Sequence, residues 1–224
     1  SFLSELIRFY QNYVDMLVDQ GAIENAREIA DSSRGRVLAD GHGIAPPARA
    51  RASAFTRLAG RSGTVLMSYW LAPVHSYVWV VDGRGVKVHR LPPAADIEKL
   101  VGQHQASLQN SLSDPLAARD GAGDQLFKLL VAPVLGFLPS GSSVIVVPDG
   151  ALHGLNFETL PVDGPRRHYW IEDVEVQVAP ALSLLTEADS APTASPTLLV
   201  IGNPTSIDPQ FPPHRIAACG NLGD

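Results

Sequence analysis

Apolar residues near the N-terminus recur every three or four positions, which is typical of an amphipathic helix. In the first twenty residues one helix face would carry Phe2, Leu3, Leu6, Ile7, Tyr10, Tyr13, Val14 and Leu17. Gly21 is well placed as a helix stop. A second helix would carry Ile23, Ala26, Ile29, Ala30, Ser33 and Val37. The pattern predicts a helical hairpin over residues 1–40, with small residues that allow a close approach of the two helices.

Residues 41–63 break this periodicity. Structure-breaking residues come first, namely Gly41, Gly43, Pro46 and Pro47, and four arginines follow at positions 49, 51, 57 and 61. Because charge clusters usually face water, we interpret this segment as a linker with a solvated face. A nucleic-acid patch is the alternative, but only Phe55 supplies an aromatic platform among these arginines.

Residues 64–91 have the alternation and turn chemistry of a β-meander. One strand begins at Val65, a second runs over residues 77–81, and the turn at residues 82–85 contains Gly83 and Gly85. Val86, Val88 and His89 then run back along the second strand. Residues 94–112 and 124–137 are helical by pattern.

Later apolar stretches predict three more strands. Residues 144–147 and 197–201 are continuously apolar, as in strands covered on both faces, whereas Val174, Val176 and Val178 alternate with polar residues. Strands that alternate with helices indicate an α/β fold.

Composition narrows the class of protein. The chain has 224 residues, 45% of them hydrophobic and 18% charged, which excludes disorder throughout. It contains no apolar run of about 18 residues, so no membrane segment is expected. With 17 basic and 23 acidic residues the net charge is −6, which argues against a nucleic-acid binder. The single cysteine, Cys219, excludes an internal disulfide and favours a cytoplasmic, reducing location.

No cofactor or metal site is expected. The glycine pairs at residues 40–43 and 120–123 lack the lysine of a phosphate-binding loop, and the seven histidines lack metal-ligand spacing. Cys219 is the only thiol, and His214 lies five residues upstream. We interpret Cys219 as a small core residue, with a role as nucleophile left as the alternative.

The segment after residues 144–147 has a more specific pattern. Pro148 would end the strand, and Asp149 and Gly150 would reverse the chain. The returning segment would be fixed on the core by apolar anchors, namely Leu152, Leu155, Phe157 and Leu160. We therefore expect a structural motif here.

This segment resembles the most recognisable motif of the CHAT domain, a caspase-like domain often found after tetratricopeptide repeats. Other stretches resemble the family in the same order, namely residues 66–69, 77–81, 126–135, 179–185 and 198–204. The first helix pair resembles a terminal tetratricopeptide unit, with Gly21 and Ala26 at matching positions.

The resemblance implies a caspase-like mixed or parallel sheet flanked by helices, in the clan of cysteine endopeptidases. Family members use a histidine base and a cysteine nucleophile, often in His-Gly and Ser-Ala-Cys-like signatures. This sequence departs there, because its His42-Gly43 and His153-Gly154 come too early. The catalytic role is therefore not transferred to Cys219.

The predicted organisation is a tetratricopeptide-like helix pair at residues 1–40, a linker at 41–63 and the front part of a CHAT domain at 64–224. Because the chain begins with Ser1 and residues 221–224 look like a helix end, we expect a fragment of a longer polypeptide. A protein partner or a peptide substrate is expected for the whole protein, with a non-catalytic CHAT scaffold as the alternative. The isolated chain should lack peptidase activity, and it should either self-associate through residues 197–201 or leave residues 209–224 poorly ordered.

Overall fold

The computed structural model describes most of the chain up to residue 180. The described residues are 2–42, 55–57, 59–60, 63–110, 116, 121–138 and 141–180, with side chains of the N-terminal hairpin described from 7 to 33. They belong to one compact unit, Ser1–Asp189. The predicted strand at 197–201, His214 and Cys219 lie outside the described residues.

The N-terminal helical hairpin is confirmed. Helix α1 runs over Phe2–Asp19 and α2 over Ile23–His42. Gly21 has a φ of 74°, and the N–H groups of Gly21 and Ala22 donate to the carbonyls of Val18 and Leu17, which is the Schellman arrangement of a helix end. Ala26 and Ala30 are fully buried. The expectation that Gly41 breaks the structure is wrong, because α2 continues through it; a glycine lowers helix stability by only about 1 kcal/mol.

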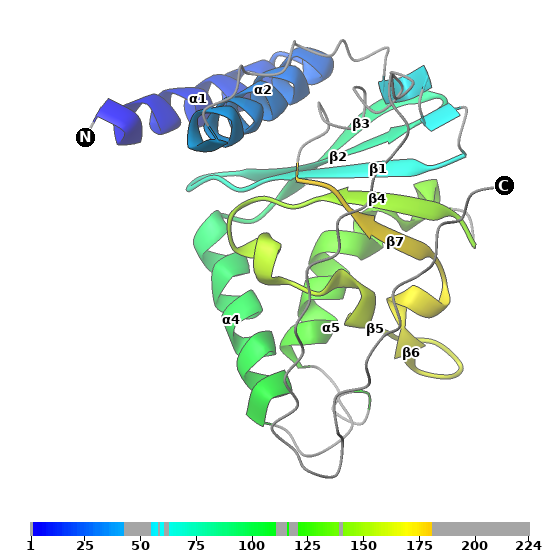
Figure 1. The fold of residues 1–224 in the computed structure, drawn as a ribbon. Coiled ribbons are helices and arrows are strands. Elements are labelled where there is room, and N and C mark those ends of the chain that lie inside the picture. The colour runs from blue at the N-terminus through cyan, green and yellow to red at the C-terminus, as the bar shows by residue number, and fades with distance from the viewer. Residues whose placement is uncertain are drawn as a thin grey trace, which may run out of the picture. The chain divides into compact units, whose positions relative to one another are not determined.

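A five-stranded mixed sheet follows the hairpin (Figure 1). Its order is β3-β2-β1-β4-β7, and the strands are β1 (Val65–Trp70), β2 (Ser76–Asp82), β3 (Gly85–Leu91), β4 (Ser143–Val147) and β7 (Glu175–Val178). The first three strands form the predicted antiparallel meander. Strands β1, β4 and β7 are parallel, so the fold is α/β as expected.

The two glycines of the β2–β3 turn have different roles. Gly85 has a φ of 146°, as the turn chemistry predicts. Gly83 does not have a positive φ. Instead, a Cβ on Gly83 would lie 3.0 Å from the Cα of Gly60, so its backbone is closely approached by another segment.

Both faces of the sheet are covered. On one face, alternate residues of β1, β2 and β4 join the largest core cluster with α4 (Ala94–Asn110) and α5 (Ala122–Leu126). On the other face, Trp70, Tyr77 and Trp79 pack against Val14 and Leu17 of α1. The α1–α2 hairpin and the α4–α5 layer therefore lie on opposite sides of the sheet, as Figure 1 shows.

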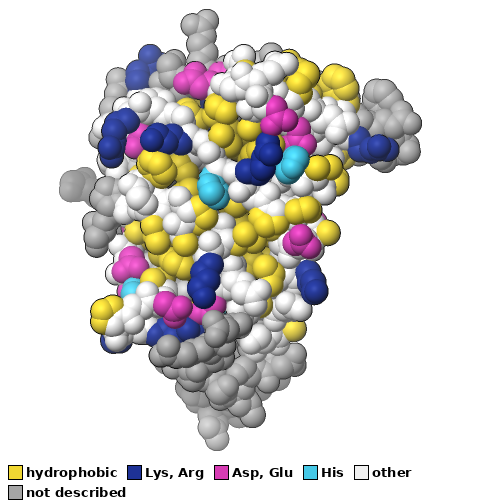
Figure 2. Space-filling model, turned by 180° about the vertical axis from the view of Figure 1, so that it is seen from behind, with side chains coloured by type: hydrophobic (Ala, Val, Ile, Leu, Met, Phe, Trp, Pro, Cys, Tyr) yellow, Lys and Arg dark blue, Asp and Glu magenta, His cyan; other side chains and the backbone are white. Residues whose placement is uncertain are grey.

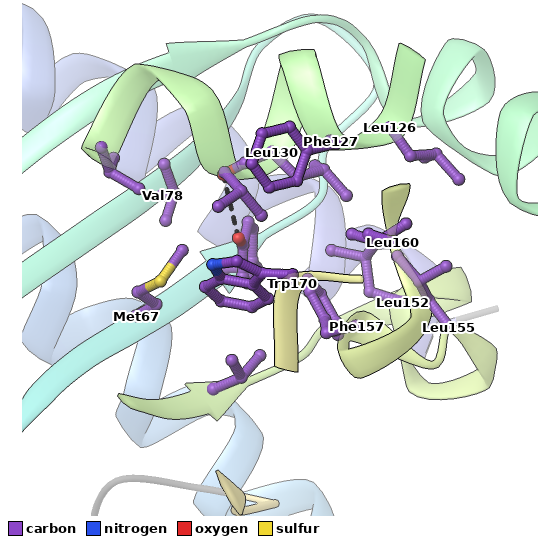
Figure 3. Packing of buried hydrophobic residues seen from close by; sticks show 14 of the residues in the cluster. Met67, Val78, Leu126, Phe127, Leu130, Leu152, Leu155, Phe157, Leu160 and Trp170 are labelled. Carbon is purple, nitrogen blue, oxygen red and sulfur yellow. Dashed lines mark hydrogen bonds between the residues drawn. The ribbon is translucent and has the colours of Figure 1, made fainter. Parts of the chain in front are cut away.

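The helix predicted over residues 124–137 is irregular. α5 continues into a π-helical turn, η1 (Phe127–Val131), and then a 3-10 segment, η2 (Ala132–Phe137), with Pro133 in its first turn. A π turn leaves backbone carbonyls without their usual helical partner. The hydroxyl of Tyr69 in β1 donates to the carbonyl of Leu130 at 3.0 Å, the dashed line in Figure 3. This bond joins the irregular helix to the sheet, and burial raises the pKa of Tyr69 well above its usual value.

Short elements connect β4 to β7. They are η3 (Gly150–Gly154), η4 (Phe157–Thr159), β5 (Pro161–Val162), β6 (His168–Tyr169) and η5 (Trp170–Glu172). Strands β5 and β6 pair as a separate two-stranded hairpin. The half-buried alternation expected for Val174, Val176 and Val178 is only partly correct. Val174 is buried and Val176 lies at the core margin, but Val178 at the strand end is 63% exposed.

Candidate functional site

The carboxyl ends of the parallel strands β1 and β4 lie side by side, and Asp149 joins the segments that follow them. Its Oδ2 accepts a hydrogen bond from the backbone N–H of Leu71 at 2.7 Å. Leu71 is the first residue after β1, and Asp149 is the second residue after β4. A charged acceptor makes this a strong hydrogen bond, so it fixes the two segments relative to each other.

Gly150 has the backbone conformation that the turn requires. Its φ is +51°, in the left-handed region that favours glycine. An added Cβ would also lie 3.2 Å from Cδ1 of Leu71. Asp149 therefore binds the backbone amide of Leu71, and Gly150 lies close to the Leu71 side chain.

The returning segment is fixed by its apolar side chains. Leu152, Leu155, Phe157 and Leu160 are 1%, 7%, 2% and 0% exposed, and all four join the largest core cluster. In Figure 3 they lie together beside Trp170 and face the side chains of α5 and η1. The Phe157 ring lies 5.5 Å from that of Tyr69, between ring centroids. The segment is therefore an integral part of the core.

Hydrogen bonds also hold this segment in place. Nε2 of Gln105 on α4 donates to the carbonyl of Gly154 at 2.7 Å. Oδ1 of Asn156 accepts from the N–H of Glu158 at 3.2 Å, which begins η4. His153 points into solvent and makes no contact that would orient it as a base within the described structure. The arrangement suits a rigid support for neighbouring loops.

A buried polar cluster lies where α4, α5 and the β5–β6 hairpin meet. Nη2 of Arg167 lies 2.7 Å from Oδ1 and 2.8 Å from Oδ2 of Asp124. Asp124 Oδ2 also accepts from the N–H of Gly121 at 3.0 Å. His104 is only 6% exposed, and burial lowers its pKa while Asp124 opposes that shift. The cluster holds the hairpin to the first turn of α5.

A second polar cluster joins the N-terminal hairpin to the sheet. The Tyr77 hydroxyl donates to Oδ1 of Asp15 at 2.7 Å, and Nη2 of Arg90 donates to Oδ1 of Asp19 at 2.6 Å. Burial, followed by the bond to Asp15, raises the pKa of Tyr77 well above its usual value. Helix α1 is therefore attached to β2 and β3 by polar contacts as well as by its apolar face.

The described residues do not assemble a nucleophile and a base. Cys219 is the only cysteine of the sequence and lies outside the described residues, as does His214. Among the described residues, three or more metal-ligating side chains do not come together anywhere. In the same part of the chain, no helix has both the length and the apolar content needed to cross a bilayer. On the face drawn in Figure 2, charges of both signs are interspersed with hydrophobic side chains.

A comparison with protein families finds a similarity for the second half of the chain. Residues 120–218 match the family model of the CHAT domain. This part of the chain is therefore similar to the CHAT domain family. The match includes α5, Asp149 and the segment 150–160 with its four buried anchors. Leu71, which donates to Asp149, lies before the matched residues. No curated protein matches the chain.

The sequence pattern missed two features of this site. The glycine pair at residues 120–123 lacks the lysine of a phosphate-binding loop, but its pattern does not reveal that a Cβ on Gly123 would lie 3.0 Å from Nδ1 of His104. Arg167 was not singled out, although its side chain is only 10% exposed. The available signal was weak: one aspartate directly after a glycine pair, and two adjacent arginines in a turn.

Proposed function

We propose that this chain is part of a caspase-like cysteine endopeptidase of the CHAT family. The observation that carries the proposal is the CHAT match over residues 120–218. The parallel strands β1, β4 and β7 with helices beside them support it, since loops after such strands commonly carry functional residues. The described residues would then act as the rigid support, and the base and nucleophile would lie outside them.

In this proposal, the α1–α2 hairpin receives the signal of a partner. Helix α1 contacts the sheet through Asp15 and Asp19, while Phe9 and Met16 are 62% and 43% exposed. A partner that binds α1 would thus contact an element attached directly to β2 and β3. Tetratricopeptide character of the hairpin is part of the proposal.

A labelling experiment tests the peptidase proposal on the chain itself. A dyad requires base and nucleophile within hydrogen-bond reach, and we expect none in this chain. The purified chain should leave a broad peptide library uncleaved, and Cys219 should react with iodoacetamide at the rate of an ordinary thiol. Cleavage that disappears in Cys219→Ala would contradict the expected inactivity and identify Cys219 as the nucleophile.

The non-catalytic CHAT scaffold is the second candidate. It is favoured by the exposed Phe9 on α1, whose ring stacks on the half-buried Tyr13 ring with centroids 6.0 Å apart. The two functions differ in a polypeptide that contains this chain and the sequence that follows it. A peptidase would cleave peptides and lose activity on replacement of one cysteine, whereas a scaffold would bind a partner without cleaving it.

A further inference from the structure

The Asp124–Arg167 ion pair is a buried polar attachment of the β5–β6 hairpin. The side chains are only 4% and 10% exposed, and Arg167 directly precedes β6. Nη1 of Arg167 also lies 3.0 Å from Oδ1 of Asp163, which is 55% exposed. A buried ion pair that loses its charge balance is strongly destabilised, so the attachment depends on the charges around it.

His104 lies at the edge of this pair with little room to move. A Cβ on Gly123 would meet Cε1 and Nδ1 of His104 at 2.9 and 3.0 Å, and Cδ of Pro161 at 3.0 Å. His104 therefore sits against the first turn of α5, close to where β5 begins. Its Nε2 is buried and has no hydrogen-bond partner among the described residues.

The charge that acts on His104 is that of Asp124, whose ion-pair partner lies on the hairpin. Asp124 belongs to α5, whereas Arg167 and Asp163 belong to the hairpin. The neighbouring η3 segment contributes only His153, which is exposed. At the other end of the hairpin, Nε2 of His168 lies 3.0 Å from Oδ2 of Asp173, and Arg166 pairs with Glu172.

We propose that the β5–β6 hairpin is an acid-released element, in which protonation of buried His104 sets a second cation against the Asp124–Arg167 ion pair. The Asp124 carboxylate already accepts from Gly121 and Arg167. A protonated His104 either competes for that carboxylate or remains an unpaired buried cation. Both outcomes weaken the attachment of residues 161–169 to α5.

The lowered pKa of His104 determines how the stability of the hairpin changes with pH. A histidine whose folded pKa lies below its unfolded value makes the folded form lose stability as pH falls through that interval. His168 acts in the opposite sense, because its pKa is raised by the Arg166 carbonyl and by Asp173. Protonation of His168 therefore strengthens the hairpin, so the two histidines require separate variants.

Hydrogen exchange on the full chain at about pH 7 and about pH 5 tests the proposal, after correction for the intrinsic pH dependence of exchange. The wild type should lose protection in residues 161–169 on acidification. His104→Leu should keep its protection, whereas His153→Leu, an exposed control on η3, should behave like the wild type. His168→Gln should lose more protection than the wild type.

Two results would overturn the proposal: unchanged hairpin protection at about pH 5 in His168→Gln, where the opposing histidine is absent, or the same acid-dependent loss in His104→Leu. If His104→Leu does not fold, an NMR titration of the histidine rings in the wild type replaces it. The His104 ring should then titrate below about 6.5, with a midpoint that coincides with the loss of hairpin protection. A midpoint at or above that value would exclude the mechanism.

Discussion

At the scale of single residues, Asp149 and Gly150 show what a sequence pattern can and cannot reveal. The Asp-Gly pair identifies a turn with a positive φ, because local backbone sterics alone decide it. The partner of Asp149 could not be predicted. Leu71 lies 78 positions away, and its amide offers no side-chain signal, so only the pairing of β1 with β4 brings the two together.

Gly150→Ala should destabilise the chain by about 1 kcal/mol or more. The added Cβ meets Cδ1 of Leu71 at 3.2 Å and also strains a φ of +51°. Gly102→Ala is the matched control, because a Cβ there, within helix α4, meets nothing within 4 Å. That control should be neutral or stabilising by up to about 1 kcal/mol. Urea unfolding midpoints measure both, and equal midpoints for the two variants would contradict the assigned turn.

At the scale of elements, apolar spacing predicts burial more accurately than it predicts backbone shape, and the segment between β4 and β7 shows the accuracy on burial. Its apolar spacing identified the four buried anchors, because burial follows from side-chain type. The π turn at Phe127–Val131 was expected to be regular helix. The Tyr69 hydroxyl donates to the Leu130 carbonyl of this turn from another element, and local sequence spacing does not reveal such a partner.

Phe157→Ala should reduce the free energy of unfolding by about 3–5 kcal/mol. Its ring is 2% exposed and lies in the core against Tyr69. Ile171→Ala removes a side chain that is 50% exposed and should cost far less. Denaturant titration of both variants measures the difference. A near-neutral Phe157→Ala would mean that the segment detaches without disturbing the core.

His168 should make the chain more stable in mild acid than in mild base. Its pKa is raised above the usual value by the Arg166 carbonyl and the Asp173 carboxylate. Its contribution is therefore fully present below the unfolded pKa of about 6.5 and is lost as pH rises through the folded pKa. Thermal unfolding of His168→Gln should lack this part of the pH dependence, whereas His153→Gln should retain it. Identical pH profiles for wild type and His168→Gln would refute the contribution.

At the scale of the whole described unit, the predicted division into hairpin, linker and CHAT part stays a prediction. Sequence periodicity located the hairpin and the meander but not their contact, because a helix face does not specify its partner. In the structure Trp70, Tyr77 and Trp79 pack against the hairpin. The buried Arg27 of α2 lies 4.7 Å from the centroid of the Phe55 ring.

Removal of residues 1–42 should expose the hairpin-facing side of the sheet and make the remaining chain aggregate. Trp70, Tyr77 and Trp79 are at most 6% exposed in the presence of the hairpin, and a large apolar patch favours association. Sedimentation and binding of a hydrophobic dye measure the effect against the full chain. A folded, monodisperse truncation product would show that the hairpin is an independent domain, as its periodicity alone suggests.

The mixed pairing of β1 has a consequence for the order in which the chain folds. β1 pairs with β2 across a short connection, so that hairpin can form as soon as both strands exist. Its other edge pairs with β4, where Val65 meets Val144 much later in the chain. Until β4 arrives, an apolar strand edge stays open and can accept a strand from another molecule. Slow synthesis between β3 and β4 should therefore lower the yield of folded protein, and rapid synthesis of that stretch should raise it.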